Sequence, residues 1–314
     1  MKHLLSLADW PREWIEGTIE HGLQIKRDPS QVARALEGRV LLMLFEKPSL
    51  RTRLSFEVAM LQMGGHAIYY DLSTSPLGKG KESFADTART ASRYVDGIMA
   101  RLFRQADLEE LAAHASVPVI NGLTDHEHPC QVLGDLMTIR EKKGRLQGVK
   151  LAYVGDGHNN VTHSLLLGGA AVGMHVSVGC PEGQEYEPDA TVLARAQAIA
   201  RETQAVIEIV HEARAAVASA DIVYTDTWMS YHIPPDQRAE RERRLRPFQV
   251  TMDLMRQARP DALFMHCLPA ERGAEMTDEV IDGPQSIVFD QAENRLHIQK
   301  AIVLRLMGGE RREP

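Results

Sequence analysis

The sequence from residue 40 to residue 56 reads VLLMLFEKPSLRTRLSF, and its two halves have different patterns. Residues 40–45 are all apolar, which is typical of a buried strand. After Pro48 the apolar residues recur three or four positions apart, which is typical of one face of a helix. This stretch therefore predicts a strand and then a helix, with residues 49–53 at the junction.

The junction gathers groups that bind anions. Ser49 and Thr52 carry hydroxyls, and Arg51 and Arg53 carry guanidinium groups. The first turn of a helix offers unpaired backbone N–H groups and the positive end of the helix dipole. A guanidinium group also fits the oxygens of a phosphate. The junction is either a phosphate site or a helix N-cap at Ser49 followed by two solvated arginines, and the rest of the chain has to decide between them.

The composition excludes several classes of protein. A chain of 314 residues with 44% hydrophobic residues suggests two packed domains. A net charge of −7 gives no reason to expect nucleic acid binding. We also expect no membrane segment, because no apolar run reaches ~18 residues. We expect no signal peptide either, because the apolar part of the N-terminus is short and soon meets Asp9 and Pro11. The three cysteines are far apart and odd in number, and neither a CxxC pair nor an HExxH motif occurs, so we expect a reduced, cytoplasmic protein without a metal site.

Strand and helix patterns alternate along both halves of the chain. In the first half we predict strands at 40–45, 67–71, 97–101 and 117–121, and helices at about 3–26 (with a break near Pro11), 51–63, 82–95, 107–114 and 129–143. In the second half we predict strands at 150–155, 175–180, 205–210, 221–225 and 262–267, a candidate further strand at 286–289, and helices at about 160–172, 189–203, 235–246, 249–258 and 294–307. This alternation is typical of parallel sheets covered by helices on both faces.

The predicted fold is therefore α/β, with two similar domains that each contain a parallel sheet flanked by helices. We place the domains at 1–143 and 144–292, because a charged run and Gly144 resemble a helix stop. The segment 293–314 is expected to form a C-terminal helix that returns to the first domain. Two such halves would leave an interdomain cleft, and ligands of open α/β sheets bind beyond the carboxyl ends of the strands.

Polar and reactive residues stand at several of these strand ends. Arg101 ends one predicted strand, His128 and Gln131 lie at the start of a helix, and Asp226 and Cys267 end or follow strands of the second half. His128 is suited either to donate a hydrogen bond to a carbonyl oxygen or to cap its helix. Taken singly, an arginine such as Arg101 is usually a solvated charge, and a cysteine such as Cys267 is commonly a structural buried residue. The alternative for Asp226 is an ordinary turn aspartate.

The segment 155–160 reads GDGHNN between a predicted strand and a predicted helix. It resembles a nucleotide-binding loop, but Asn160 occupies the position of the last glycine in GxGxxG, so a nucleotide-dependent oxidoreductase has little support. Asn159 and Asn160 are suited either to cap the helix or to bind a polar substrate.

Five motifs together carry a family resemblance. FEKPSLRTR, DGIMAR, HPCQ, DTWMS and HCLP, in this order and spacing, resemble the aspartate/ornithine carbamoyltransferase family, and HPCQ with HCLP favours its ornithine branch. The resemblance extends at least from residue 40 to residue 295. It implies transfer of a carbamoyl group from carbamoyl phosphate to the side-chain amine of L-ornithine, which gives L-citrulline and phosphate in arginine metabolism. It also implies a homotrimer or a multiple of trimers. The reaction needs no metal or organic cofactor, and from the charge and the apolar pattern we expect neither nucleic acid nor membrane as a partner.

The resemblance implies roles for individual residues as well. The carbamoyl-phosphate-binding residues would be Ser49, Leu50, Arg51, Thr52, Arg101, His128, Gln131, Cys267, Leu268 and Arg295. The ornithine-binding residues would be Asn160, Asp226, Ser230 and Tyr231. Within these sets, the catalytic residues would be Arg51, Arg101, His128 and Cys267.

Three positions depart from the family pattern. Leu50 replaces a threonine of the usual STRTR motif, so one hydroxyl donor is lost. Pro76 stands where the family often has a glutamine that contacts phosphate, and the lysines of loop 75–82 either compensate or are simply solvated. Tyr231 and His232 replace Met-Gly in the loop that selects ornithine. An N-acylated ornithine or another diamine therefore stays open as the acceptor, and a non-catalytic homologue is a further alternative.

Overall fold

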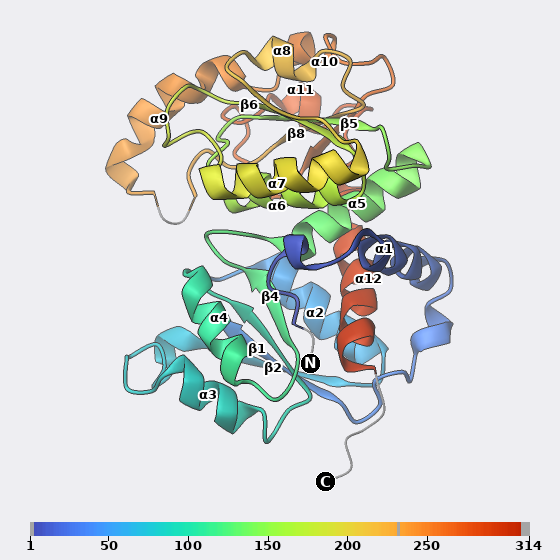
Figure 1. Cartoon of the computed structure of the whole chain (residues 1–314), viewed down its shortest axis with the longest axis vertical. Coiled ribbons are helices and arrows are strands. Elements are labelled where there is room, and N and C mark those ends of the chain that lie inside the picture. The colour runs from blue at the N-terminus through green and yellow to red at the C-terminus, as the bar shows by residue number, and fades with distance from the viewer. Residues whose placement is uncertain (1–2, 231–232, 309–314) are drawn as a thin grey trace. The chain divides into compact units, whose positions relative to one another are not determined.

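A computed structural model of the chain describes residues 3–230 and 233–308 (Figure 1). The chain divides into two compact units. The first unit consists of Met1–Met137 and Glu293–Pro314, and the second unit consists of Thr138–Ala292. In the part of the chain that the structure describes, no helix has the length and apolar character needed to cross a membrane.

The first unit is built on a four-stranded parallel sheet in the order β2-β1-β3-β4. Its strands are β1 Val40–Phe45, β2 His66–Asp71, β3 Gly97–Arg101 and β4 Val119–Leu123. The predicted strands are thus confirmed, except that β4 begins two residues late and ends two residues late. Pro118 explains the late start, because it has no N–H group to donate to a sheet ladder.

Helices cover this sheet. They are α1 Arg12–Arg27, α2 Leu50–Gln62, α3 Phe84–Ala91, α4 Gln105–His114, α5 Pro129–Lys143 and α12 Val288–Met307. The prediction of one broken helix over 3–26 was wrong at its start, because the backbone of Leu4 pairs with β4 and Leu7–Asp9 forms only a 3-10 turn. Pro11 is the N-cap of α1 and separates the two segments.

The second unit contains a five-stranded parallel sheet in the order β7-β6-β5-β8-β9. Its strands are β5 Lys150–Val154, β6 His175–Gly179, β7 Ile207–Val210, β8 Ile222–Thr225 and β9 Leu263–His266. Its helices are α6 Asn160–Ala171, α7 Ala190–Thr203, α8 Ala213–Val217, α9 Arg238–Leu245, α10 Met252–Met255 and α11 Asp278–Ile281. In Figure 1, α6 and α7 cover one face of this sheet, and α8 and α10 lie on the other.

Three predictions for the second half were wrong in detail. Residues 286–289 are no strand, because Ser286 makes only an isolated bridge to Phe264 and α12 starts at Val288. The helix predicted at 235–246 begins as a 3-10 turn that contains Pro235, and the one predicted at 249–258 is reduced to α10.

Each sheet has a point at which the direction of the chain reverses. In the first unit the chain passes from β1 outward to β2 and then returns to place β3 on the other side of β1. In the second unit the same reversal lies between β5 and β8. Ligands of doubly wound sheets bind outside the carboxyl ends of the strands at such a point. The loops after β1, β3, β5 and β8 are therefore the places to look for a site.

Candidate active site

The loop after β1 leads directly into α2, and Ser49 is the N-cap of that helix. The Ser49 Oγ atom accepts a hydrogen bond from the Thr52 N–H group at 3.2 Å, so the capping interpretation holds for this residue. A capping hydroxyl still has its own proton to donate to an anion. Thr52 is buried, Arg51 is half-buried, and the Leu50 side chain is 70% exposed, so Leu50 offers an anion only its backbone.

The two arginines of this motif differ in their surroundings. Arg53 is exposed, pairs with Glu57 at 3.0 Å, and lies with its guanidinium carbon 3.9 Å from the centroid of the Tyr69 ring. Arg51 has a charge that acts on His128, a residue predicted for the same site. The structure thus separates an arginine that faces the candidate site from one that braces the helix against β2.

Four further predicted residues gather in the first unit: Arg101, His128, Gln131 and Arg295 are all buried. The Nη1 group of Arg295 donates to Gln131 Oε1, and Gln131 Nε2 donates to Asp135 Oδ1 at 2.8 Å. Arg295 lies two turns into α12 rather than in its first turn, because that helix begins earlier than its sequence pattern suggests.

His128 reports the electrostatics of this group. Burial lowers its pKa well below 6.5, and the positive charges of Arg295, Arg101, Arg51 and Lys47 lower it further. The imidazole is therefore neutral at physiological pH, and it is able to hydrogen-bond to a carbonyl oxygen without adding charge. A site with this excess of cations is suited to a small multivalent anion.

Lys47 is a member of this group that the sequence reasoning missed. It is 2% exposed, its ammonium group pairs with Asp125, and it lies 4.3 Å from the centroid of the Phe103 ring. The Asp125 N–H group donates to the Phe103 carbonyl at 2.8 Å, and the Phe103 N–H group donates to Glu46 Oε2 at 2.7 Å. These contacts join the loops that follow β1, β3 and β4. The sequence signal was a lysine two residues after the end of a buried strand.

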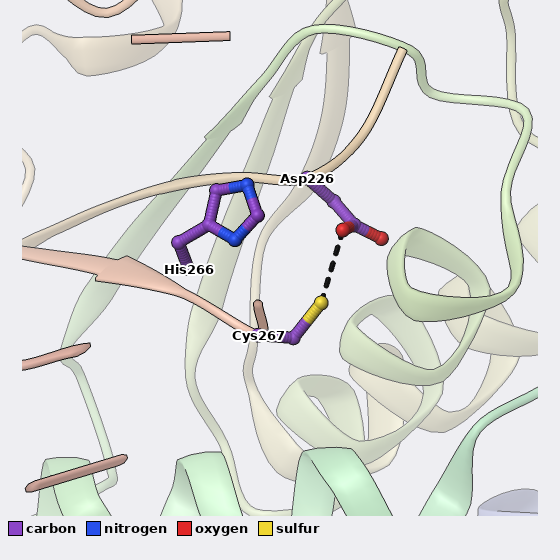
Figure 2. Close-up of side chains that lie close together, drawn as sticks. All are labelled: Asp226, His266 and Cys267. Atoms are coloured by element: carbon purple, nitrogen blue, oxygen red, sulfur yellow. Dashed lines mark hydrogen bonds between the residues drawn. The ribbon is translucent and has the colours of Figure 1, made fainter. Parts of the chain in front are cut away.

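In the second unit, β8 and β9 place three reactive side chains together (Figure 2). The Cys267 thiol donates to Asp226 Oδ1 at 3.0 Å. The Nδ1 atom of His266 accepts a hydrogen bond from the Leu268 N–H group at 2.9 Å, so a neutral His266 carries its proton on Nε2. Leu268 has a φ of 58°, which makes a tight turn of the HCLP motif.

The same three residues are the group of possible metal ligands found within residues 3–230 and 233–308, with one donor atom from each within 4.8 Å of the others. Carboxylate, imidazole and thiolate all bind zinc, but a tetrahedral structural site needs a fourth ligand. Here the thiol proton is shared with Asp226 and one nitrogen of His266 accepts the backbone N–H of Leu268. A metal ion would have to displace the first of these bonds.

The remaining acceptor residues lie on loops of the second unit. Asn159 caps α6 by accepting from the Val161 and Thr162 N–H groups, both at 2.9 Å, so the capping alternative holds for Asn159. Asn160, the first residue of α6, and Ser230 are both half-buried. Tyr231 and its neighbour His232 lie outside the described residues.

A second ion pair, in which both side chains are buried, was also missed from the sequence. Asp156 follows β5, and its carboxylate pairs with Arg241 on α9. Asp156 is fully buried, and burial raises its pKa to about 6 although the Arg241 charge acts in the opposite direction. The partner of Asp156 is remote in sequence, which is why the GDGHNN pattern alone could not identify this pair.

Comparison with known proteins agrees with this arrangement. Residues 2–141 match the carbamoyl-P binding domain of aspartate/ornithine carbamoyltransferases, and residues 147–306 match their Asp/Orn binding domain. The ornithine carbamoyltransferase of Thermococcus kodakarensis is 51% identical over 313 residues, which cover 98% of this chain and 97% of that protein. An anabolic ornithine carbamoyltransferase of Pyrococcus furiosus is 51% identical over 311 residues, covering 98% of this chain and 97% of that protein.

The fold comparison leads to the same group. The structure of ornithine carbamoyltransferase from Pyrococcus furiosus superposes with a TM-score of 0.94 at 51% sequence identity, and it covers 99% of this chain and 98% of that one. Likeness of this extent spans both units and all five motifs. The chain therefore belongs to the aspartate/ornithine carbamoyltransferase family.

Proposed function

We propose that the protein transfers the carbamoyl group of carbamoyl phosphate to the side-chain amine of L-ornithine, with L-citrulline and phosphate as products. The observation that carries this proposal is the buried group of Arg101, His128 and Arg295 beside Arg51, at the carboxyl end of the first sheet. Relatives at 51% identity that are named ornithine carbamoyltransferase support the choice of acceptor.

The first unit binds the donor in this proposal. Phosphate oxygens accept hydrogen bonds from the hydroxyls of Ser49 and Thr52, the backbone N–H groups of the first turn of α2, and the guanidinium groups of Arg51 and Arg101. Three residues of the first unit surround the carbamoyl group, together with the backbone of two residues of the second unit: His128, Gln131, Arg295, Cys267 and Leu268.

The second unit binds the acceptor. Asp226 offers a buried carboxylate that is suited to the α-ammonium group of ornithine. We assign Asn160, Ser230 and Tyr231 to the rest of the amino-acid end of ornithine. Cys267 lies next to Asp226, and we assign the attacking amine to the vicinity of its sulfur.

The chemistry requires orientation and charge stabilisation. The neutral amine nitrogen attacks the carbamoyl carbon, the bond from this carbon to the phosphate oxygen breaks, and the nitrogen loses one proton. Negative charge develops on the carbonyl oxygen and on the leaving phosphate, where prearranged donors are most effective. Neutral His128 and cationic Arg295 face the first, and Arg51 and Arg101 face the second.

The decisive experiment supplies the purified protein with carbamoyl phosphate and one amine at a time. The amines are ornithine, N-acetylornithine, N-succinylornithine, putrescine, lysine and aspartate, and the ureido product is measured. Ornithine is expected to be the best acceptor. A panel in which ornithine gives no product while another amine does would show that the acceptor is wrong, and Tyr231 would then be the first residue to examine.

Activity is expected to rise with pH from 6.5 to 9. The attacking amine must lose its proton, and kcat/KM for ornithine should rise about tenfold per pH unit below the pKa of the amine. The lowered pKa of His128 keeps that residue neutral over this range, so its titration does not add a second rise. Initial rates at saturating carbamoyl phosphate measure this, and a flat profile would contradict the need for a neutral amine.

We also propose that the protein is a homotrimer or a multiple of trimers. Three apolar side chains of α2 are strongly exposed, namely Leu50, Leu54 and Leu61 at 70%, 49% and 72%. They fall on one side of the helix, and an exposed apolar row of this kind is typical of a subunit contact.

The double variant Leu54→Lys/Leu61→Lys should reduce the mass measured by light scattering to that of a smaller species, because two charges would disrupt this apolar row. Phe289→Lys, at a residue that is 69% exposed outside α2, is the control and should leave the mass unchanged.

A cytoplasmic location and a role in arginine biosynthesis complete the proposal. All three cysteines are free thiols, and burial raises the pKa of Cys130 and Cys180 to about 12, so neither reacts readily. The anabolic name of the relative in Pyrococcus furiosus supports the biosynthetic direction. Cell fractionation tests the cytoplasmic location. Growth of an arginine auxotroph that carries this gene tests the biosynthetic role.

A further inference from the structure

Helix α9 carries several arginines, and one of them differs from the rest. Arg241 is 6% exposed, whereas Arg238 and Arg243 pair with glutamates on the surface. The Nη2 group of Arg241 donates to Asp156 Oδ2, and its Nε–H group donates to the Trp228 carbonyl at 3.0 Å. Its guanidinium carbon also lies 5.0 Å from the centroid of the Tyr186 ring. The guanidinium group is thus held on three sides.

The two hydrogen-bond partners of Arg241 belong to different loops. Asp156 lies in the loop between β5 and α6, where its Oδ1 atom also accepts from the His158 N–H group at 3.1 Å. That loop leads directly into α6, whose first residue is Asn160. Trp228 lies in the turn that carries Asp226 and Ser230. One side chain therefore connects the two loops on which all the described candidates for ornithine binding stand.

Electrostatics favour the same role. Asp226 and Asp156 are close enough for the charge of one to raise the pKa of the other. Arg241 offsets the charge of Asp156, so the two neighbouring carboxylates Asp156 and Asp226 are not left as an uncompensated pair. A buried ion pair costs desolvation energy, and a fixed geometry is one reason for a protein to retain it.

We propose that Arg241 is a positioning residue that sets the affinity for the amino-acid substrate by fixing the 155–160 loop and the 226–230 turn relative to each other. The proposal rests on the proposed function, because it assigns these two loops to the acceptor. Arg241 itself touches no substrate in this proposal. Its effect is exerted through Asn160, Asp226 and Ser230.

Arg241→Met tests this, because methionine fills much of the same space without the two donors. KM for ornithine is expected to rise about 10- to 100-fold, since small misplacements of substrate-binding groups have effects of this size. KM for carbamoyl phosphate should stay within about twofold, because the first unit is untouched. Arg241→Lys should lie between the wild type and Arg241→Met, because an ammonium group cannot reproduce both contacts of the planar guanidinium fork.

Arg243→Met is the matched control. Arg243 lies on the same helix, but its side chain is 70% exposed and pairs only with Glu240 in the described contacts, so both KM values should stay within about twofold. The double variant Asp156→Asn/Arg241→Met separates charge from position. Asp156→Asn removes the negative charge that Arg241→Met leaves without its guanidinium partner, but it does not restore the connection between the two loops. KM for ornithine should therefore stay raised.

Several outcomes would overturn the inference. An unchanged KM for ornithine in folded Arg241→Met would do so, and so would an equal rise in the KM values of both substrates, because that indicates a general loss of structure. If circular dichroism shows that Arg241→Met does not fold, Arg241→Lys and Asp156→Asn decide on the same two criteria. A wild-type protein that forms no citrulline would instead refute the proposed function, which is a separate and earlier result in the same assay.

Discussion

Replacing Arg51 by alanine is expected to lower kcat/KM for carbamoyl phosphate about 10³-fold, the upper range for loss of one prearranged charged donor. Arg51 is half-buried at the first turn of α2, and its charge acts on His128 in the same group. Its guanidinium group is placed to neutralise the phosphate, both in the bound donor and as it leaves. Both KM and kcat should therefore change. Steady-state rates at saturating ornithine measure the effect.

Arg53→Ala is the control that gives this result its meaning. Arg53 is on the same helix, carries the same charge, and lies only two residues away. Its side chain pairs with Glu57 and lies over Tyr69, away from His128 in every described contact. Its removal should change kcat/KM by less than about threefold, as is usual for an exposed ion pair. Equal losses in the two variants would contradict a specific phosphate site and indicate only a general effect of positive charge.

Much of the fold could be predicted because its signals are local. The apolar run of β1 and the helical spacing of α2 lie within 23 residues of one another, and both elements form where their patterns indicate. The predicted bounds of strands were wrong at positions where the local pattern is that of a strand but the backbone does not pair with the sheet. Pro118 moved the start of β4, and residues 286–289 resembled a strand although only Ser286 pairs with the sheet.

The candidate site was predicted less completely, because its supporting contacts are not local. Lys47 pairs with Asp125 across 78 residues, and Arg241 pairs with Asp156 across 85. Neither partner carries a sign of the other in its own neighbourhood. Local patterns identified residues at strand ends, but they could not identify the side chains that fix those strand ends together.

The two missed ion pairs have a common place in the fold. Each involves a residue of the loop after a strand at the reversal point of its sheet, β1 in the first unit and β5 in the second. At each of these points a buried cation with a carboxylate partner connects the loop to another segment of the same unit. In each unit the candidate substrate-binding residues stand on the loops so constrained.

Asp226→Asn is the variant with the largest expected effect on the acceptor. The substitution preserves shape but removes the buried negative charge, which is the feature suited to an ammonium group. KM for ornithine should rise about 10²- to 10³-fold, because removing one partner of a buried charge pair costs several kcal/mol. Binding of phosphonoacetate, a stable analogue of the donor, should be unchanged, and calorimetry measures it.

A surface aspartate supplies the comparison for Asp226. Asp253 lies on the short helix α10, and its 81% exposed side chain pairs with Arg256, the C-cap of that helix. Asp253→Asn should leave both KM values unchanged. Asp226 also accepts the Cys267 thiol proton, so a second variant is needed to separate the two partners. Cys267→Ser retains a donor to Asp226, and it should raise KM for ornithine less than Asp226→Asn does. If both variants raised KM equally, the thiol contact and not the substrate ammonium would be the main function of Asp226. If Asp226→Asn changed neither KM nor kcat, the acceptor would have to bind elsewhere in the second unit.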